Sequence, residues 1–482
     1  MRRFIFPCVA ATGLLIVSAL PVFAQTSDYG LPQLGSTGGS TATQEEYRLG
    51  RAWLRQFRAQ APSWQDPISQ HYVESLVNRL LPHSDLSNIQ PLVTLIDSRL
   101  LNAFAVPGGI IGVNAGLFSF ADSEDAFASV LAHELGHISQ RHHARQQQRA
   151  EETQLPTMAA LLAGMLIAAG GGGQAGIATA MGSQAAFLQD QLAYSRRYEQ
   201  EADRVGLRAL AEAGFDPNAM VEMFRSMQRM ASLQGGNPPE FLLTHPVTES
   251  RISDTQARAA QLSVSNRRDA TPQYDMIRAR ALLDLHRNDP NQAITRLAQS
   301  DPAPEARRYL EALVSAERGD LQGALNRLDQ LATELPDLTM IPATAVEVAL
   351  DAGNHEETQS RAQRLLRLFP GHTPTQLLQA EALLQSDPEQ AYDLLRNLAD
   401  NRPEDPQIFI LLTEAAGNTG RNGWGHLARA EELQLTGRID RAIRQLDIAD
   451  DVATREGNTR LLQRIEQRRK DFLDYRETLE QF

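Results

Sequence analysis

The chain has 482 residues, of which 42% are hydrophobic and 22% are charged, and its formal net charge is −13. This length exceeds one ordinary hydrophobic core, so two or three globular domains are expected. The acidic excess, which no basic cluster relieves, argues against a nucleic-acid partner because phosphate backbones repel an acidic surface.

Residues 1–24 have the pattern of a secretory signal peptide, in which Arg2 and Arg3 precede an apolar run that ends in VFA. Cys8, the only cysteine, lies in this run, so the mature chain would contain none, as suits an oxidising bacterial periplasm. We therefore expect cleavage after Ala24 and a periplasmic protein of a Gram-negative bacterium. A retained membrane anchor is the alternative.

The next elements are predicted from local composition. Residues 25–43 are rich in Gly, Ser and Thr, which indicates a flexible segment. Helical patterns cover 44–60 and 66–82, and the β-branched stretch at 92–98 predicts a strand. Residues 102–118 predict a strand, a Pro-Gly-Gly turn and a second strand, and the edge of this hairpin offers unpaired backbone groups to an extended substrate.

The stretch ADSEDAFASVLAHELGHISQ predicts a helix whose acidic start suits the positive end of the helix dipole. His133 and His137 lie one helical turn apart, so both imidazoles share one face and can bind one metal ion. Glu134 can reach a metal-activated water and take its proton during attack on a peptide carbonyl. Gly136 costs about 1 kcal/mol in a helix relative to alanine, and we expect it to leave room beside the metal.

A third protein ligand has two candidates, and the first is His143. It occupies the last position of the pattern His-Glu-x-x-His-x-x-Gly-x-x-His, in which the chain leaves the helix at the glycine. Gln140 replaces that glycine, and residues 138–152 are predicted to prolong the helix. On a continuous helix His143 points away from the face that carries His137, so it cannot complete the site.

The second candidate is Glu199, in the predicted helix YSRRYEQEADRVGLRAL. Glu199 can reach the ion by packing across the first helix, and Asp203, one turn later, can fix the tautomer of a ligand histidine or assist proton transfer. Glu201 is expected to point elsewhere, and Val205, four residues on, offers it no partner. A charged helix in solvent is the alternative interpretation, but the upstream motif favours Glu199.

The HELGH motif followed by SRRYEQEAD resembles the zinc peptidases that include the CAAX prenyl proteases and the HtpX-like membrane proteases. The resemblance implies one Zn²⁺ per chain, held by His133, His137 and Glu199, with Glu134 as the catalytic base and Asp203 as the proton donor. The transmembrane helices of those relatives are missing from this sequence, which argues against intramembrane or prenylated substrates.

His245, in LLTHPVTESRI, precedes a proline in a loop that enters a predicted helix. In the proteases that this chain resembles, a histidine at this position can fill the fourth coordination site of zinc and displace the water. The resemblance therefore implies an inhibitory switch at His245, with an ordinary loop histidine as the alternative. Arg251 is expected to brace this loop rather than to stabilise the oxyanion.

The stretch MAALLAGMLIAA at 158–169 is strongly apolar. As a helix it would be about 18 Å long, against roughly 30 Å of bilayer hydrocarbon, so it cannot span a membrane. A buried helix and an apolar lid or docking element beside the cleft are both open interpretations, and so is peripheral association with a membrane.

The C-terminal half contains helical segments that recur after similar turns. The turns GDLQGA, GNHEET and SDPEQA begin at residues 319, 353 and 386, and a proline closes each unit. This spacing predicts six tetratricopeptide repeats within 270–482. Such an array buries its apolar faces by stacking and presents a concave surface that binds other proteins.

The predicted fold is therefore mainly α. An α+β gluzincin-type peptidase domain with a small β-hairpin or sheet is expected at 44–265, followed by an α-solenoid of tetratricopeptide repeats at 270–482. An exported family member with such repeats implies outer-membrane quality control, in which stalled or unfolded β-barrel proteins are degraded or helped to assemble. The repeats would dock the β-barrel assembly machinery. The alternative is a repeat-based chaperone or scaffold with minor or latent proteolysis.

Overall fold

The structure is a computed structural model, and it describes residues 41–86, 89–149, 195–233, 240–264, 267 and 269–480. The predicted signal peptide, most of the predicted flexible segment and the apolar stretch at 158–169 lie outside the described residues. Among the helices that are described, none combines the length and apolar character needed to cross a bilayer.

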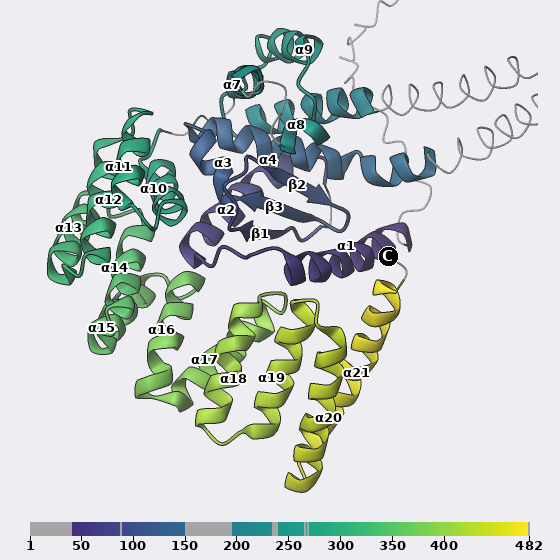
Figure 1. The fold of residues 1–482 in the computed structure, drawn as a ribbon, viewed down its shortest axis with the longest axis vertical. Coiled ribbons are helices and arrows are strands. Elements are labelled where there is room, and N and C mark those ends of the chain that lie inside the picture. Colours follow the sequence, from purple (N-terminus) through teal and green to yellow (C-terminus); the bar gives the residue numbers. More distant parts are fainter. Residues whose placement is uncertain are drawn as a thin grey trace, which may run out of the picture. The chain divides into compact units, whose positions relative to one another are not determined.

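Three short strands form the sheet that lies at the centre of the N-terminal half (Figure 1). They are β1 (Leu92–Ile96), β2 (Ala103–Val106) and β3 (Ile110–Asn114), in the order β1-β3-β2. β1 runs parallel to β3, whereas β2 pairs with it antiparallel through the predicted Pro-Gly-Gly turn, in which both glycines have positive φ. β2 is therefore an edge strand of this sheet.

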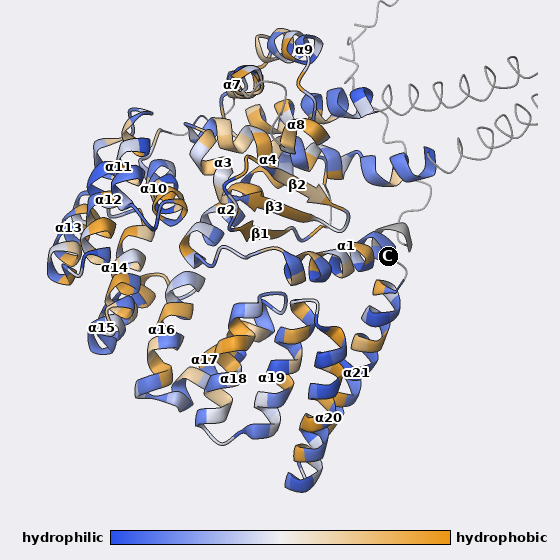
Figure 2. Cartoon of the chain, viewed as in Figure 1, coloured by the Kyte–Doolittle hydropathy of each residue, from blue (hydrophilic) through white to orange (hydrophobic). Residues whose placement is uncertain are grey.

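The predicted strand, turn and second strand are confirmed, but the second strand is shorter than expected. It ends at Asn114, and the chain continues as α3 (Ala115–Phe120). All five residues of β3 are buried, and the strands are predominantly apolar (Figure 2). A central strand covered on both faces has no polar face to mark its end, so the apolar run did not separate strand from helix.

The sheet is covered by α1 (Thr41–Gln60), α2 (Pro67–Leu80) and α4 (Glu124–Ser139), which pack against its strands. The other helices of this half are the short 3₁₀ helix η2 (Leu81–His83), α7 (Asn218–Leu233), which packs on α4, α8 (Glu240–Thr244), and α9 (Glu249–Ala259), which packs on α7. Residues 142–149 and 195–212 are also helical. α4 begins as predicted: the Ser123 side chain accepts the Ala126 backbone N–H at 3.2 Å, and Glu124 and Asp125 occupy the first turn. Such a cap stabilises a helix by about 1 kcal/mol.

The C-terminal half, over the described residues 269–480, is a series of six antiparallel helix pairs (Figure 1). The pairs are α10 (Gln273–Leu285) with α11 (Pro290–Ala298), α12 (Pro304–Glu317) with α13 (Leu321–Glu334), α14 (Met340–Asp351) with α15 (His355–Leu368), α16 (Thr373–Ser386) with α17 (Pro388–Asn401), α18 (Pro406–Asn418) with α19 (Asn422–Leu435), and α20 (Ile439–Glu456) with α21 (Thr459–Leu479). The predicted fold class is confirmed: the chain is mainly α, with a small sheet in its N-terminal α+β half followed by an α-solenoid of helix pairs.

The repeat turns explain why the period was visible in the sequence. Asp320, Asn354 and Asp387 each cap the second helix of their pair by accepting a backbone N–H three residues on. The small residue that follows packs against the partner helix, and Ala324 and Ala391 are completely buried. The turn before α19 lacks this signal, because Arg421 stands at the N-cap and makes no side-chain cap.

The apolar core continues from the N-terminal half into the first helix pair. The Phe118 and Phe127 rings stack with centroids 4.3 Å apart, and the Phe127 and Tyr274 centroids are 5.6 Å apart. The Tyr274 hydroxyl, on α10, donates to the Ala121 carbonyl at 2.7 Å. The domain boundary between 265 and 270 therefore stays a prediction, since packing does not stop there.

The last repeats contact α1. Arg55 is almost completely buried, and its Nε donates to Gln434 Oε1 at 2.6 Å. Its guanidinium also lies over the Tyr475 ring on α21, 4.1 Å from the centroid. At Gly437, which has φ 75°, a Cβ would lie 2.3 Å from the Arg55 carbonyl oxygen. Glycine thus permits the close approach of this turn to α1.

Candidate metal centre

Two glycines allow α4 and the helix at 195–212 to cross closely. A Cβ at Gly136 would lie 2.7 Å from the Ala202 carbonyl oxygen, and a Cβ at Gly206 would lie 2.8 Å from the Ala132 carbonyl oxygen. The expectation that Gly136 leaves room beside a metal is therefore wrong. The space is taken by the backbone of the second helix, and this close crossing brings side chains of the two helices together.

The crossing places four side chains around one point. The Nε2 atoms of His133 and His137 are 3.1 Å apart, and Glu199 Oε2 and Oε1 lie 3.4 Å from them respectively. His245, from the loop after α8, points its Nδ1 into the same space, 3.3 Å from His133 Nε2 and 3.1 Å from both Glu199 oxygens. One ligand atom from each of the four residues lies within 4.8 Å of all the others.

These separations suit a divalent metal ion. In a tetrahedral site with metal–ligand bonds of about 2.0–2.1 Å, neighbouring ligand atoms are roughly 3.3 Å apart. At this centre His133 Nε2 lies 3.1–3.4 Å from the ligand atoms of the other three residues, and all four ligand atoms lie within 4.8 Å of one another. Imidazole nitrogens and a carboxylate are ligands that zinc accepts. The lone pairs of two imidazole Nε2 atoms and a carboxylate repel one another at these distances unless a proton or a cation lies between them. This set of donor atoms therefore fits a metal ion.

His133 is held from behind by a buried carboxylate. Its Nδ1 lies 2.9 Å from Asp203 Oδ1, and Arg251 makes a two-pronged contact with Asp203 at 2.7 Å for both pairs of atoms. Burial would raise the pKa of Asp203, but Arg251 and His133 lower it, so this side chain is ionised. Burial would lower the pKa of His133, but Asp203 and Glu199 raise it to about 10. A metal ion therefore competes with a proton at His133.

Glu134 directly follows His133 on α4, and its side chain is almost completely buried. Its Oε1 has no hydrogen-bond partner among the described residues and lies 3.8 Å from His245 Nε2. Burial raises the pKa of Glu134, although His245, His133 and the backbone of Ala105 on β2 act against this rise. A buried carboxyl group with a free oxygen beside a metal-binding cluster and an edge strand is placed to exchange a proton with a reactant.

The expected continuous helix through 138–152 is wrong. α4 ends at Ser139, Arg141 adopts a left-handed conformation with φ 50°, and a new helix covers 142–149. The Arg141 guanidinium compensates this strained backbone by pairing with Glu46 Oε1 of α1 at 2.7 Å. The chain thus leaves the helix without the glycine that the sequence argument required.

This break determines which histidine returns to the centre. His143 is exposed and takes no part in the cluster, in agreement with the sequence argument but for a different reason. The returning residue is His142, which is buried and has its Nδ1 2.9 Å from His137 Nδ1. His142 was missed because a helix drawn straight through Arg141 directs it elsewhere.

Glu201 lies outside the ligand cluster, as expected, but it has partners other than Val205. Glu201 Oε2 lies 3.2 Å from His142 Nε2 and accepts a hydrogen bond from Arg145 Nη1 at 2.8 Å. Both partners belong to the helix that follows the break at Arg141. Val205 is the neighbour of Glu201 four residues along the same helix, whereas the actual partners of Glu201 lie on the helix at 142–149.

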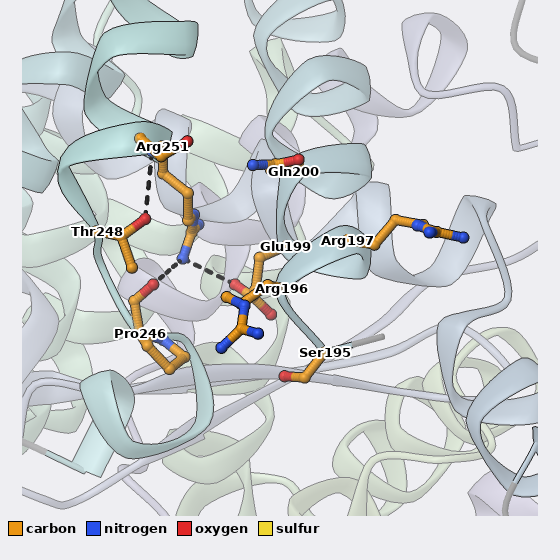
Figure 3. A pocket seen from close by; sticks show the side chains of 9 residues that line it. Ser195, Arg196, Arg197, Glu199, Gln200, Pro246, Thr248 and Arg251 are labelled. Carbon is orange, nitrogen blue, oxygen red and sulfur yellow. Dashed lines mark hydrogen bonds and ion pairs between the residues drawn. The ribbon is translucent and has the colours of Figure 1, made fainter. Parts of the chain in front are cut away.

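The loop that carries His245 is tied to the same centre by Arg251. Arg251 Nη1 donates to the Pro246 carbonyl at 2.8 Å and lies 2.9 Å from Glu199 Oε2, and the Thr248 hydroxyl accepts the Arg251 backbone N–H. Figure 3 shows these contacts at the wall of a cavity of about 350 Å³. Because its guanidinium is used in these contacts, Arg251 holds the loop and both carboxylates in place.

Comparison with known proteins gives the class. The sequence pattern of Peptidase family M48 matches residues 67–259. The mitochondrial metalloendopeptidase OMA1 of Schizosaccharomyces pombe is 32% identical over 184 residues, which are 38% of this chain and 50% of that protein. Together with the His-Glu-x-x-His helix and the cluster around it, these matches define a metalloendopeptidase of the M48 type.

Two bacterial relatives match almost the whole chain. The β-barrel assembly-enhancing protease of Escherichia coli K12 is 32% identical over 445 residues, which cover 90% of each protein. The putative β-barrel assembly-enhancing protease of Vibrio cholerae is 32% identical over 455 residues, 92% of this chain and 91% of that one. The chain therefore belongs to the family of β-barrel assembly-enhancing proteases.

Proposed function

We propose that this protein is a periplasmic zinc endopeptidase that degrades misfolded or stalled outer-membrane proteins and assists the assembly of β-barrels. The observation that carries the peptidase activity is the convergence of His133, His137 and Glu199 beside the buried carboxyl group of Glu134. The substrate class is supported by the names of the full-length relatives, and the periplasmic location by the N-terminal signal pattern.

In this proposal His133, His137 and Glu199 hold one zinc ion. Zinc, when bound, supplies a Lewis acid that activates water and polarises a peptide carbonyl. Glu134 is the base that takes the proton from the attacking water and returns it to the leaving amine, because its free oxygen faces the cluster. Asp203 was expected to orient a ligand or to donate a proton, and its ionised state and contact with His133 favour the orienting role.

The substrate is proposed to bind as an added strand on β2. This strand is the edge of the sheet, α4 packs against it, and the backbone of Ala105 reaches Glu134. Main-chain hydrogen bonds to β2 would hold an extended peptide with little regard to its side chains. Such binding suits unfolded β-barrel precursors, whose segments have a high β propensity and no partner strands. The repeat array would dock the β-barrel assembly machinery.

His245 is proposed to act as a switch. Its Nδ1 lies at hydrogen-bonding distance from both Glu199 oxygens and belongs to the cluster of ligand atoms. A histidine in that position takes the place that a reacting water needs, so the enzyme would be inactive until the loop moves. Arg251 fixes the loop through the Pro246 carbonyl, which gives the inactive arrangement a defined structure.

The variant Glu134→Gln tests the proposed function. We expect it to retain zinc and to lose cleavage of an unfolded β-barrel protein by roughly 10²–10⁴-fold, because an amide cannot act as the base. The matched control is Glu212→Gln, which removes the same charge from an exposed side chain. Undiminished cleavage by Glu134→Gln would overturn the assignment of the base.

The same variant separates the peptidase from a chaperone or scaffold, which the six repeat pairs favour as the second candidate. It is expressed in a strain that lacks the gene, and outer-membrane integrity is measured by the entry of large antibiotics. A peptidase role predicts little rescue. Full rescue at wild-type protein levels would show that the scaffold role dominates.

A further inference from the structure

His137 is held from behind, as His133 is, but through a second imidazole. Its Nε2 faces the cluster, 3.1 Å from His133 Nε2, and its Nδ1 faces His142 Nδ1 at 2.9 Å. On its far side, His142 Nε2 lies 3.2 Å from Glu201 Oε2. The three side chains therefore form one continuous series from a carboxylate to a ligand nitrogen.

When His142 is a neutral imidazole, hydrogen-bond chemistry allows this series one consistent arrangement of protons. Glu201 as a carboxylate can only accept, so His142 carries its proton on Nε2 and donates it there. His142 Nδ1 is then an acceptor, and His137 must carry its proton on Nδ1. The Nε2 lone pair of His137 is thereby directed at the cluster, which is the form of imidazole that binds a metal.

The position of His142 is fixed from several sides. The left-handed residue Arg141 turns the chain back, and His142 itself is 4% exposed. Its ring stacks on Tyr198 with centroids 4.6 Å apart and an interplanar angle of 22°. Arg145 contacts Glu201 Oε2 at 2.8 Å and lies over the Tyr198 ring, 4.8 Å from its centroid. Little rotational freedom remains for the His142 ring.

We propose that His142 and Glu201 are positioning residues that set the tautomer and the ring orientation of His137 for metal binding. This inference rests on the proposed function, in which His137 is a ligand. Asp203 does the same for His133 by direct contact, at 2.9 Å from its Nδ1. Each histidine ligand thus has its own carboxylate, one adjacent and one reached through His142, and the two carboxylates lie two residues apart on the same helix.

The test measures the zinc dissociation constant of the full mature chain by competition with a chromogenic chelator. Loss of a group that orients a ligand typically weakens metal binding 10- to 100-fold, and we expect His142→Leu to do so. His142→Asn keeps an acceptor near the position of Nδ1 and should recover part of the loss. Glu201→Gln retains an acceptor oxygen but loses its charge, so we expect a smaller weakening. His143→Leu and Glu212→Gln are matched controls and should bind zinc as the wild type does.

Two results would overturn the proposal. One is unchanged zinc affinity in both His142→Leu and Glu201→Gln. The other is equal affinity of His142→Asn and His142→Leu, which would mean that the ring acts by packing and not by accepting a hydrogen bond. If His142→Leu does not fold, His142→Asn and Glu201→Gln decide the matter by themselves. A wild-type chain that binds no zinc would refute the proposed function instead, so the two failures are distinguishable.

Discussion

The metal centre and the junction around Arg280 are both buried polar clusters, yet they differ in how their charges are balanced. Arg280 Nε donates to Asp66 Oδ2 at 2.7 Å and Nη2 donates to Glu347 Oε1 at 2.8 Å, and the remaining N–H groups reach the hydroxyls of Tyr309 and Thr344. Every partner at this junction comes from the chain itself. At the metal centre, in contrast, acceptor atoms face one another.

The difference shows how a binding site can be told from a structural cluster. A guanidinium surrounded by acceptors has its charge and its hydrogen bonds satisfied within the protein, so its loss should affect folding. In the metal centre, imidazole nitrogens and a carboxylate point at one another at 3.1–3.4 Å, and Arg251 contacts Glu199 only from one side, so loss of one of these ligands should affect metal binding. Changes in the two clusters are therefore expected to have opposite profiles of activity and stability.

The largest effect is expected from Glu199→Gln. The variant lacks a charged ligand, so we expect zinc content to fall far below one per chain and cleavage of an unfolded β-barrel protein to fall to background. Stoichiometric zinc analysis and a peptidase assay measure both. His143→Ala serves as the control. The opposite outcome, in which His143→Ala loses zinc and Glu199→Gln keeps it, would favour the third-histidine arrangement.

Arg280→Met should have the reverse profile. Removal of the guanidinium leaves Asp66 and Glu347 buried without their partner, and breaking such a pair costs about 3–5 kcal/mol of unfolding free energy. Urea denaturation measures the loss, and the zinc content of the folded fraction should stay unchanged. Arg308→Met, at an exposed ion pair with Glu334, should leave the unfolding midpoint unaltered. Equal stability of the two variants would mean that the buried junction is not a structural support.

His245→Ala sharpens the comparison within the metal centre. We expect it to keep zinc, since three ligands remain, and to raise the cleavage rate, because nothing then holds the place of the reacting water. A rise of about tenfold would correspond to about 1.4 kcal/mol in favour of the inactive loop. Steady-state cleavage measured against His143→Ala provides the comparison. A rate that is unchanged or lower would rule out the switch.

The smallest effect concerns pH and a histidine pair between α2 and α16. The rings of His71 and His372 have centroids 5.2 Å apart, and burial together with His71 lowers the pKa of His372 to about 4. In the unfolded chain the pKa of a histidine is about 6.5, so between about pH 4 and 6.5 the unfolded state binds more protons than the folded state. Stability is therefore complete above about pH 6.5 and decreases as the pH falls towards 4. His372→Gln should flatten this part of the curve in thermal unfolding, and an unchanged slope would contradict it.

Elements with a strong local pattern could be predicted from the sequence. The helix of His133 and His137, the hairpin with its Pro-Gly-Gly turn and the capped turns of the repeats all carry their determinants within a few residues. The grouping of Glu199 with the two histidines is also present in the structure, because spacing along each helix placed the side chains on facing sides.

What escaped prediction depends on contacts between distant segments. The break at Arg141 is compensated by Glu46, and Gly136 is needed because of Ala202. Neither cause is visible in the neighbouring sequence. Without the break at Arg141, neither the position of His142 nor the role of Glu201 can be predicted. A motif predicts which side chains face a site. The groups that orient those side chains belong to other segments, and their positions depend on the tertiary fold.

The contact between α1 and the last repeats has a practical consequence for dissecting the chain. A fragment cut near residue 265 would strip Gln434 and Tyr475 from Arg55 and uncover a guanidinium that the intact chain shields almost completely. The proteolytic half is thus not a free-standing module. If the excised fragment were inactive or aggregated, the cause would be the loss of these packing contacts, and not the loss of regulation by the repeats.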